Sequence, residues 1–156
     1  MIERAQRLHA SHWQGVVYLT GGGSPLLSDL LAIPGASNTV LEAAVPYAAQ
    51  ALSELLGHAP EQAASAQTGR GLSMRAYQRA RDLGAKQAFG IGLSASLSSN
   101  EPKKGQTRAH WAIQTESKSA SFSLYLDNAD PRADQEQQLN EAIWATIEMN
   151  LLDNDQ

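Results

Sequence analysis

The sequence predicts one α/β domain, in which a mixed, mostly parallel sheet lies between two layers of helices. Short apolar runs that suit buried strands alternate with helical patterns over the first ninety or so residues. A run of three glycines joins the first apolar segment to a helix, and a hairpin pattern follows near residues 109–126. This order is typical of a three-layer α/β/α domain, and 156 residues suffice for a single domain over 1–156.

The glycine loop, residues 20–24, is the segment around which the chain is organised. The apolar run 16–19 before it has the length of a buried strand. After the glycines, Ser24 is predicted to cap a helix over 25–32, whose first turn accommodates Pro25. A helix N-terminus behind a glycine loop attracts anions, because free N–H groups and the helix dipole point at one spot. No Gly-Lys-Ser/Thr or GxGxxG motif follows, so an anion site and a tight turn that binds nothing both remain open.

The rest of the first half predicts three helices and a strand around that loop. A short helix is expected over residues 2–10, a turn at 33–37 and a strand over 39–45. The next helix should run from Pro46 to Leu56, with Gly57 as its C-terminal cap. A further helix should end near residue 83, and Ser65 and Ser73 are the two candidates for its N-cap.

The second half predicts three strands and a long helix. An apolar, glycine-spaced strand at 88–93 leads into a polar second loop, residues 94–105. Strands at 109–115 and 119–126 should form the hairpin, and a helix should begin at Pro131. Ligands of such sheets bind at the carboxyl ends of strands. We therefore expect the glycine loop and the second loop to face each other and, with Tyr47, to line one pocket.

Composition narrows the functional classes. The net charge is −4 without a long basic run, which does not favour nucleic acid as a partner. The absence of cysteine excludes disulfide and thiolate chemistry and agrees with a cytoplasmic protein. No apolar run predicts a membrane span, and the first residues do not resemble a signal peptide. The four histidines lack the spacing of metal ligands, so no metal site is predicted.

Three motifs carry a family resemblance: Thr-Gly-Gly-Gly-Ser at 20–24, Pro-Gly-Ala-Ser at 34–37 and Val-Pro-Tyr at 45–47. In these motifs, and over about residues 5–152, the chain resembles the CinA C-terminal domain family. Members of that family resemble nicotinamide-nucleotide amidohydrolases, also called NMN deamidases. The resemblance implies hydrolysis of a C–N amide bond without a cofactor, a phosphate-bearing small-molecule nucleotide as ligand, and a homo-oligomer.

The chain departs from the family pattern at chemically important positions. Thr20 falls where the family has its proposed serine nucleophile, and Leu52 falls where the family has a lysine. Of two family arginines near the start of the last helix, Arg132 matches one, while Glu136 stands at the other position. Amide hydrolysis through a hydroxyl needs a base to take its proton, and leucine cannot serve as one.

The predicted site has one catalytic residue, Thr20, and a larger set of substrate-binding residues. Several of these residues have a structural alternative: Thr20 bonding local backbone, Ser24 capping a helix, Tyr47 packing half-buried, and Lys103 and Lys104 lying in a solvated turn. Two functions follow: an amidohydrolase of a nucleotide such as NMN, or a binding or regulatory module that keeps the cleft and has lost the chemistry. The predicted substrate-binding residues are Gly21, Gly22, Gly23, Ser24, Tyr47, Ser94, Lys103, Lys104 and Arg132.

Overall fold

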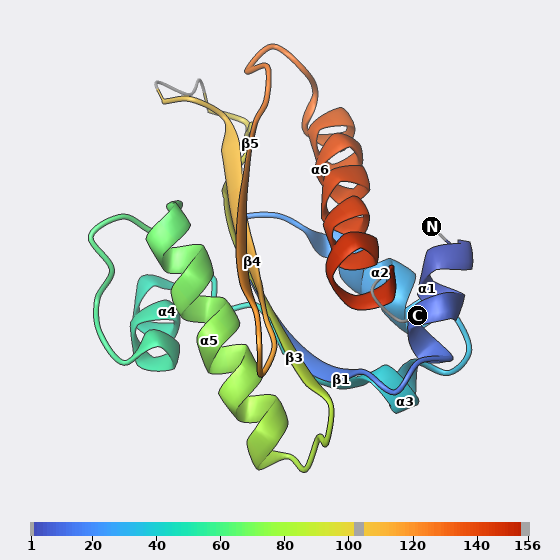
Figure 1. Ribbon diagram of the computed structural model, residues 1–156. Helices are drawn as coiled ribbons and strands as arrows, with labels where there is room; N and C mark the ends of the chain where they lie inside the picture. The colour runs from blue at the N-terminus through green and yellow to red at the C-terminus, as the bar shows by residue number, and fades with distance from the viewer. Residues whose placement is uncertain (1, 102–104, 154–156) are drawn as a thin grey trace.

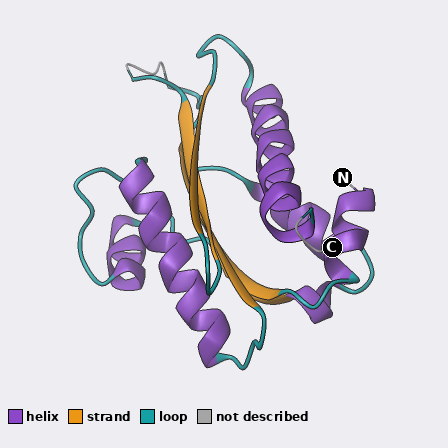
Figure 2. Ribbon diagram, in the orientation of Figure 1, coloured by secondary structure: helices purple, strands orange, loops and turns teal. Residues whose placement is uncertain are grey.

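A five-stranded sheet separates two helical layers in the computed structural model, which describes residues 2–101 and 105–153 (Figure 1). Helices α4 (Ala49–Leu56) and α5 (Ala66–Asp82) cover one face of the sheet (Figures 1 and 2). The other face carries α1 (Ile2–His9), α2 (Ser24–Ala32), α3 (Ala36–Thr39), α6 (Arg132–Ile147) and the π-helical η1 (Glu148–Leu152). The predicted α/β/α architecture is therefore confirmed. None of the helices in the described ranges is long and apolar enough to cross a membrane.

The sheet has the strand order β2-β1-β3-β4-β5. Strand β1 pairs in parallel with β2 and β3, whereas β3–β4 and β4–β5 are antiparallel. The sheet is thus mixed, as predicted, but the expectation that it is mostly parallel is wrong. After β3 the chain returns to β4 through the second loop and to β5 through a tight turn, so the last three strands form an antiparallel meander. The strands are β1 (Gln14–Thr20), β2 (Val40–Ala44), β3 (Ala88–Ser96), β4 (Arg108–Gln114) and β5 (Ser119–Tyr125).

Local details correct some sequence-based expectations. Gly23, with φ 94°, is the N-cap of α2, and Ser24 is the first helical residue rather than the cap. Of the two candidate caps for α5, the structure selects Ser65, whose hydroxyl accepts a hydrogen bond from the Thr68 amide at 3.1 Å. The expected turn and strand start at 33–40 contain the short helix α3. Strand β3 continues to Ser96, so the second loop begins later than expected.

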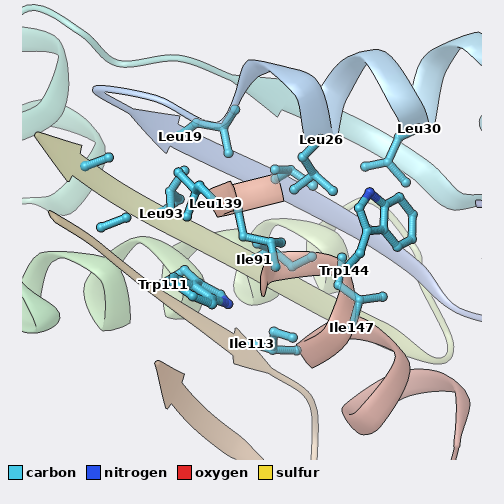
Figure 3. Packing of buried hydrophobic residues seen from close by; sticks show 14 of the residues in the cluster. Leu19, Leu26, Leu30, Ile91, Leu93, Trp111, Ile113, Leu139, Trp144 and Ile147 are labelled. Carbon is cyan, nitrogen blue, oxygen red and sulfur yellow. The ribbon is translucent and has the colours of Figure 1, made fainter. Parts of the chain in front are cut away.

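The face that carries α2 and α6 is filled by large side chains. Figure 3 shows Leu26 and Leu30 of α2 and Trp144 and Ile147 of α6 close to the side chains of β1, β3 and β4. Trp144 is fully buried. The burial of many such side chains, each stabilising the fold by about 1.5–3 kcal/mol, makes this the main apolar core.

The face that carries α5 is packed differently, because helix and strand approach almost backbone to backbone. A Cβ on Gly92 would lie 2.2 Å from the Ser73 amide nitrogen, and one on Gly90 would lie 2.2 Å from that of Tyr77. Only glycine leaves room for this approach. The glycine spacing of β3 is therefore a requirement of packing against α5.

Candidate functional site

The glycine loop and the second loop meet where β1 and β3 end. Thr20, the last residue of β1, is in register with Ser94 of β3. Gly21 has φ 82°, and a Cβ there would lie 1.9 Å from the Ala95 carbonyl oxygen. The two loops therefore contact each other, as the sequence predicted.

Arg132, at the start of α6, ties these loops together. Its Nη2 donates to the Gly21 carbonyl oxygen at 3.0 Å, and its Nη1 donates to the Ser98 carbonyl oxygen at 3.2 Å. Beside it, the fully buried Gln135 accepts from the Ser98 amide at 2.9 Å. The guanidinium still borders an open cleft of about 590 Å³. That cleft is lined by Ser98, Ser99, Asn100, Glu101, Asn128, Asp130, Pro131 and Arg132.

A carboxylate of the chain itself occupies the N-terminus of α2. The Gly23 amide donates to Glu136 Oε1 at 2.9 Å, and Glu136 Oε2 lies 3.9 Å from Arg132 Nη2. The Glu136 side chain is only 14 % exposed. Of the two alternatives that the sequence left open, an anion site and an empty turn, the structure places a carboxylate at this helix N-terminus, but the carboxylate belongs to the chain itself. One sequence signal could have indicated this internal anion: Glu136 stands where the family resemblance implies an arginine.

Glu136 also lines an acidic cleft of about 1,320 Å³ between α2 and α6. Asp29 lies in its wall, where its Oδ2 accepts from Asn140 Nδ2 at 2.8 Å and from Trp144 Nε1 at 3.0 Å. Its lining, as far as the described residues go, includes no lysine, arginine or histidine, and a phosphate would meet a negative potential there. The acidic residues are Asp29, Asp130, Asp134, Glu136 and Glu141.

Thr20 belongs to the opposite, α5 side of the sheet. Side chains alternate along a strand, and Thr20 shares the side of Val16 and Tyr18, which pack in the α5-face cluster. It is 6 % exposed, and within residues 2–101 and 105–153 no hydrogen bond reaches its hydroxyl. Leu52 is 3 % exposed in the same cluster. The position to which the resemblance assigns a lysine is therefore part of the apolar core.

Tyr18, two residues before Thr20, is not a base at neutral pH either. Its hydroxyl donates to Glu42 Oε2 at 2.9 Å. Burial, followed by the contact with Glu42, raises the pKa of Tyr18 to about 12. Hydrogen bonds from Arg79 lower the pKa of Glu42 and keep it a carboxylate. This trio links β1, β2 and α5 and leaves the phenol protonated.

The remaining predicted residues do not converge on Thr20. Ser94 is fully buried, donating to the Ser65 carbonyl oxygen at 2.9 Å and accepting from the Ser65 amide at 3.2 Å. These bonds fasten the start of α5 to β3 and engage the hydroxyl. Tyr47 is 65 % exposed in the turn after β2. Lys103 and Lys104 lie outside the described residues. Within those residues, no group of three or more histidines and carboxylates is placed to hold a metal ion.

The comparisons with known proteins support a fold. No protein-family model matches the sequence, and no curated protein matches it. The structure is similar to that of the competence damage-inducible protein A (ComA) from Klebsiella pneumoniae subsp. pneumoniae MGH 78578, with a TM-score of 0.76 and 15 % identity, over 97 % of this chain and 97 % of that one.

Two further crystal structures agree. The CinA superfamily protein ECK1530/EC0983 from Escherichia coli matches with a TM-score of 0.75 and 18 % identity, over 97 % of this chain and 91 % of that one. The competence/damage inducible protein CihA from Agrobacterium tumefaciens matches with a TM-score of 0.73 and 18 % identity, over 95 % of this chain and 93 % of that one. The chain therefore has the CinA superfamily fold over almost its whole length.

Proposed function

We propose that this chain, which has the fold of the CinA superfamily, is a small-molecule-binding module related to the nicotinamide-nucleotide amidohydrolases, in which amide hydrolysis is weak or lost. Its ligand is a mononucleotide such as NMN, or the nucleoside that corresponds to it, and the ligand binds where β1 and β3 end. The observation that carries this proposal is the hydrogen bond from the Gly23 amide to Glu136. It fills the helix N-terminus, the place at which a glycine loop of this kind would otherwise receive an anionic group of a ligand.

The chemistry of amide hydrolysis supports the loss of turnover. A hydroxyl nucleophile needs a general base, which contributes about 10²–10⁴-fold to the rate. In the described structure, the hydroxyl of Thr20 has no hydrogen-bonded base, and its sequence neighbour Tyr18 keeps its proton. Leu52 replaces the only side chain that the resemblance offers for this role. Binding without efficient hydrolysis is the function that this set of residues supports.

Glu136 also sets the expected ligand preference. A phosphate at the glycine loop would have to displace this carboxylate from the Gly23 amide or share the site with a second negative charge. A riboside lacks the phosphate and avoids that repulsion. We therefore expect the wild-type chain to bind nicotinamide riboside at least as tightly as NMN.

Titration calorimetry with NMN and nicotinamide riboside tests the proposal. Glu136→Gln removes the charge and should strengthen NMN binding by about tenfold, equivalent to about 1.4 kcal/mol, with little effect on the riboside. Asp134→Asn is the matched control, because it removes one charge from the same acidic cleft without a contact to the glycine loop. If neither the wild type nor Glu136→Gln gave a heat of binding with either ligand, the nucleotide site would be contradicted.

Weak hydrolysis at Thr20 is the second candidate, and one observation favours it. The Thr20 hydroxyl lies at the end of β1 and makes no hydrogen bond with any described residue, so it is not engaged structurally. We expect ammonia release from NMN close to background. Robust release by the wild type that Thr20→Val abolishes, with binding retained, would establish the hydrolase instead. Release that survives Thr20→Val would place the chemistry at another hydroxyl.

A further inference from the structure

Strand β5 forms one edge of the sheet, and no other strand among residues 2–101 and 105–153 pairs with its outward side. Its side chains alternate between exposed and half-buried along all seven residues. The Leu126 amide donates to the Thr107 carbonyl oxygen at 2.9 Å, just beyond the strand. Residues two apart in an antiparallel ladder direct their backbone bonds to the same side. The N–H and C=O groups that face the open edge are therefore those of Ser119, Ser121, Ser123 and Tyr125.

This edge lacks the features that keep edge strands apart. Exposed edges are usually short, charged, interrupted by proline or bulged. Strand β5 has seven residues without a charge or a proline, and it pairs with β4 without a register shift. The opposite edge, β2, is shorter and carries Glu42, which is ion-paired with Arg79 at 3.1 Å. The two edges of one sheet thus differ in their protection.

We propose that β5 pairs antiparallel with β5 of a second copy of this chain, giving a two-fold dimer with one continuous ten-stranded sheet. In such a dimer, the side chains of paired residues must lie on the same face of the sheet. The two-fold axis therefore lies where one residue pairs with the same residue of the second copy. Only an axis at Phe122 pairs all seven residues of both strands.

This register is complementary on both faces. On the α6 face, Phe122 meets its own copy and Ala120 meets Leu124 of the second copy, so half-buried apolar side chains are covered. Phe122 already stacks on Trp111, with ring centroids 5.7 Å apart, and the dimer extends that apolar cluster across the axis. On the α5 face, Ser121 meets Ser123 of the second copy. A strand that matches itself in this way favours a second copy over an unrelated peptide.

Size-exclusion chromatography with light scattering tests the dimer. The wild type should be dimeric at about 100 μM. At that concentration, a dimer with a dissociation constant of about 1 μM is almost completely formed. Ser121→Pro removes an outward N–H while leaving the bonds to β4, and it should yield a monomer with a similar thermal midpoint. Ser121→Lys, which brings two like charges together near the axis, should do the same. Ser121→Ala keeps the amide and should remain dimeric.

A single cysteine tests the register, since the chain has none of its own. Residues that oppose each other in a non-hydrogen-bonded pair have Cα atoms about 4.5 Å apart, within reach of a disulfide. Phe122→Cys should therefore cross-link two copies under mild oxidation. Ala120→Cys, on the same face but off the axis, should not. A monomeric wild type, or a dimer that persists in both Ser121→Pro and Ser121→Lys, would overturn the proposal.

Discussion

The two faces of the sheet bury their residues in different ways. The α2/α6 face is filled by large side chains, among them Phe89, Ile91 and Trp144. The α5 face has glycines where α5 crosses β3, and at Gly90 and Gly92 the strand touches the helix backbone. The first face is stabilised mainly by buried apolar volume, whereas the second depends on close backbone approach.

This difference explains why the predicted site does not form one pocket. Thr20 and Ser94 belong to the close-packed α5 face, where Ser94 already fastens α5 to the sheet. Glu136 and Arg132 project from α6 on the other side and contact the glycine loop. The hydroxyls and the charged groups of the candidate site are thus divided between the two faces. A ligand that used both sets would have to lie across the end of the sheet.

The largest expected effect is on the side-chain-filled face. Trp144→Ala should lower the free energy of unfolding by about 4 kcal/mol, because it leaves a large cavity and removes an N–H donor from Asp29. Urea unfolding followed by circular dichroism measures the change. Trp144→Phe keeps most of the volume and loses the donor, so it should cost about 1–2 kcal/mol. Equal costs for the two variants would show that the volume contributes little.

A smaller but still large effect is expected on the close-packed face. Gly92→Ala should cost about 2–3 kcal/mol, because the added methyl group would meet the Ser73 amide and the Gly69 carbonyl oxygen of α5. Gly71→Ala is the matched control: its methyl group would meet only a Leu56 methyl, 3.0 Å away, and alanine favours the helix. The control should change unfolding by less than about 1 kcal/mol in the same urea experiment. A Gly92→Ala protein as stable as the control would contradict backbone-to-backbone packing.

The smallest expected effect is a pH dependence, also on the α5 face. Burial, and to a lesser degree the charge of Arg108, lower the pKa of His110 from its ordinary value of 6.5. The unfolded chain therefore binds a proton that the folded chain does not, and stability should fall as the pH drops below 6.5. Urea midpoints at about pH 7.5 and about pH 5.5 should differ more for the wild type than for His110→Asn. The same difference in both proteins would assign the dependence to other groups.

Much of the fold could be predicted from the sequence. Apolar periodicity and caps such as Ser65 and Gly57 located nearly every helix and strand, because these signals depend on local chemistry. The glycines of β3 could be noticed but not explained, since the reason lies in a helix packed against them. The short helix α3 was missed because its four residues resemble a turn.

The site was predicted less well. The contact between the glycine loop and the second loop followed from the order of the strands, and the structure has it. The bond from Gly23 to Glu136 joins residues far apart in the sequence, and no local pattern encodes it. The engagement of the Ser94 hydroxyl by the Ser65 backbone was equally invisible, because it joins two residues that lie 29 positions apart in the sequence.

The strand order also has a kinetic consequence. Strands β4 and β5 are joined by a tight turn, whereas β1, ending at Thr20, must find β3, beginning at Ala88. Contacts between segments distant in sequence form late, because the chain loses more entropy in closing the longer loop. The β4–β5 hairpin should therefore gain amide protection early in refolding, and the amides of β1 and β3 that bond each other should gain it late. Pulse-labelled hydrogen exchange would resolve this order, in which the end of β1 that carries the glycine loop is among the last parts of the protein to assemble.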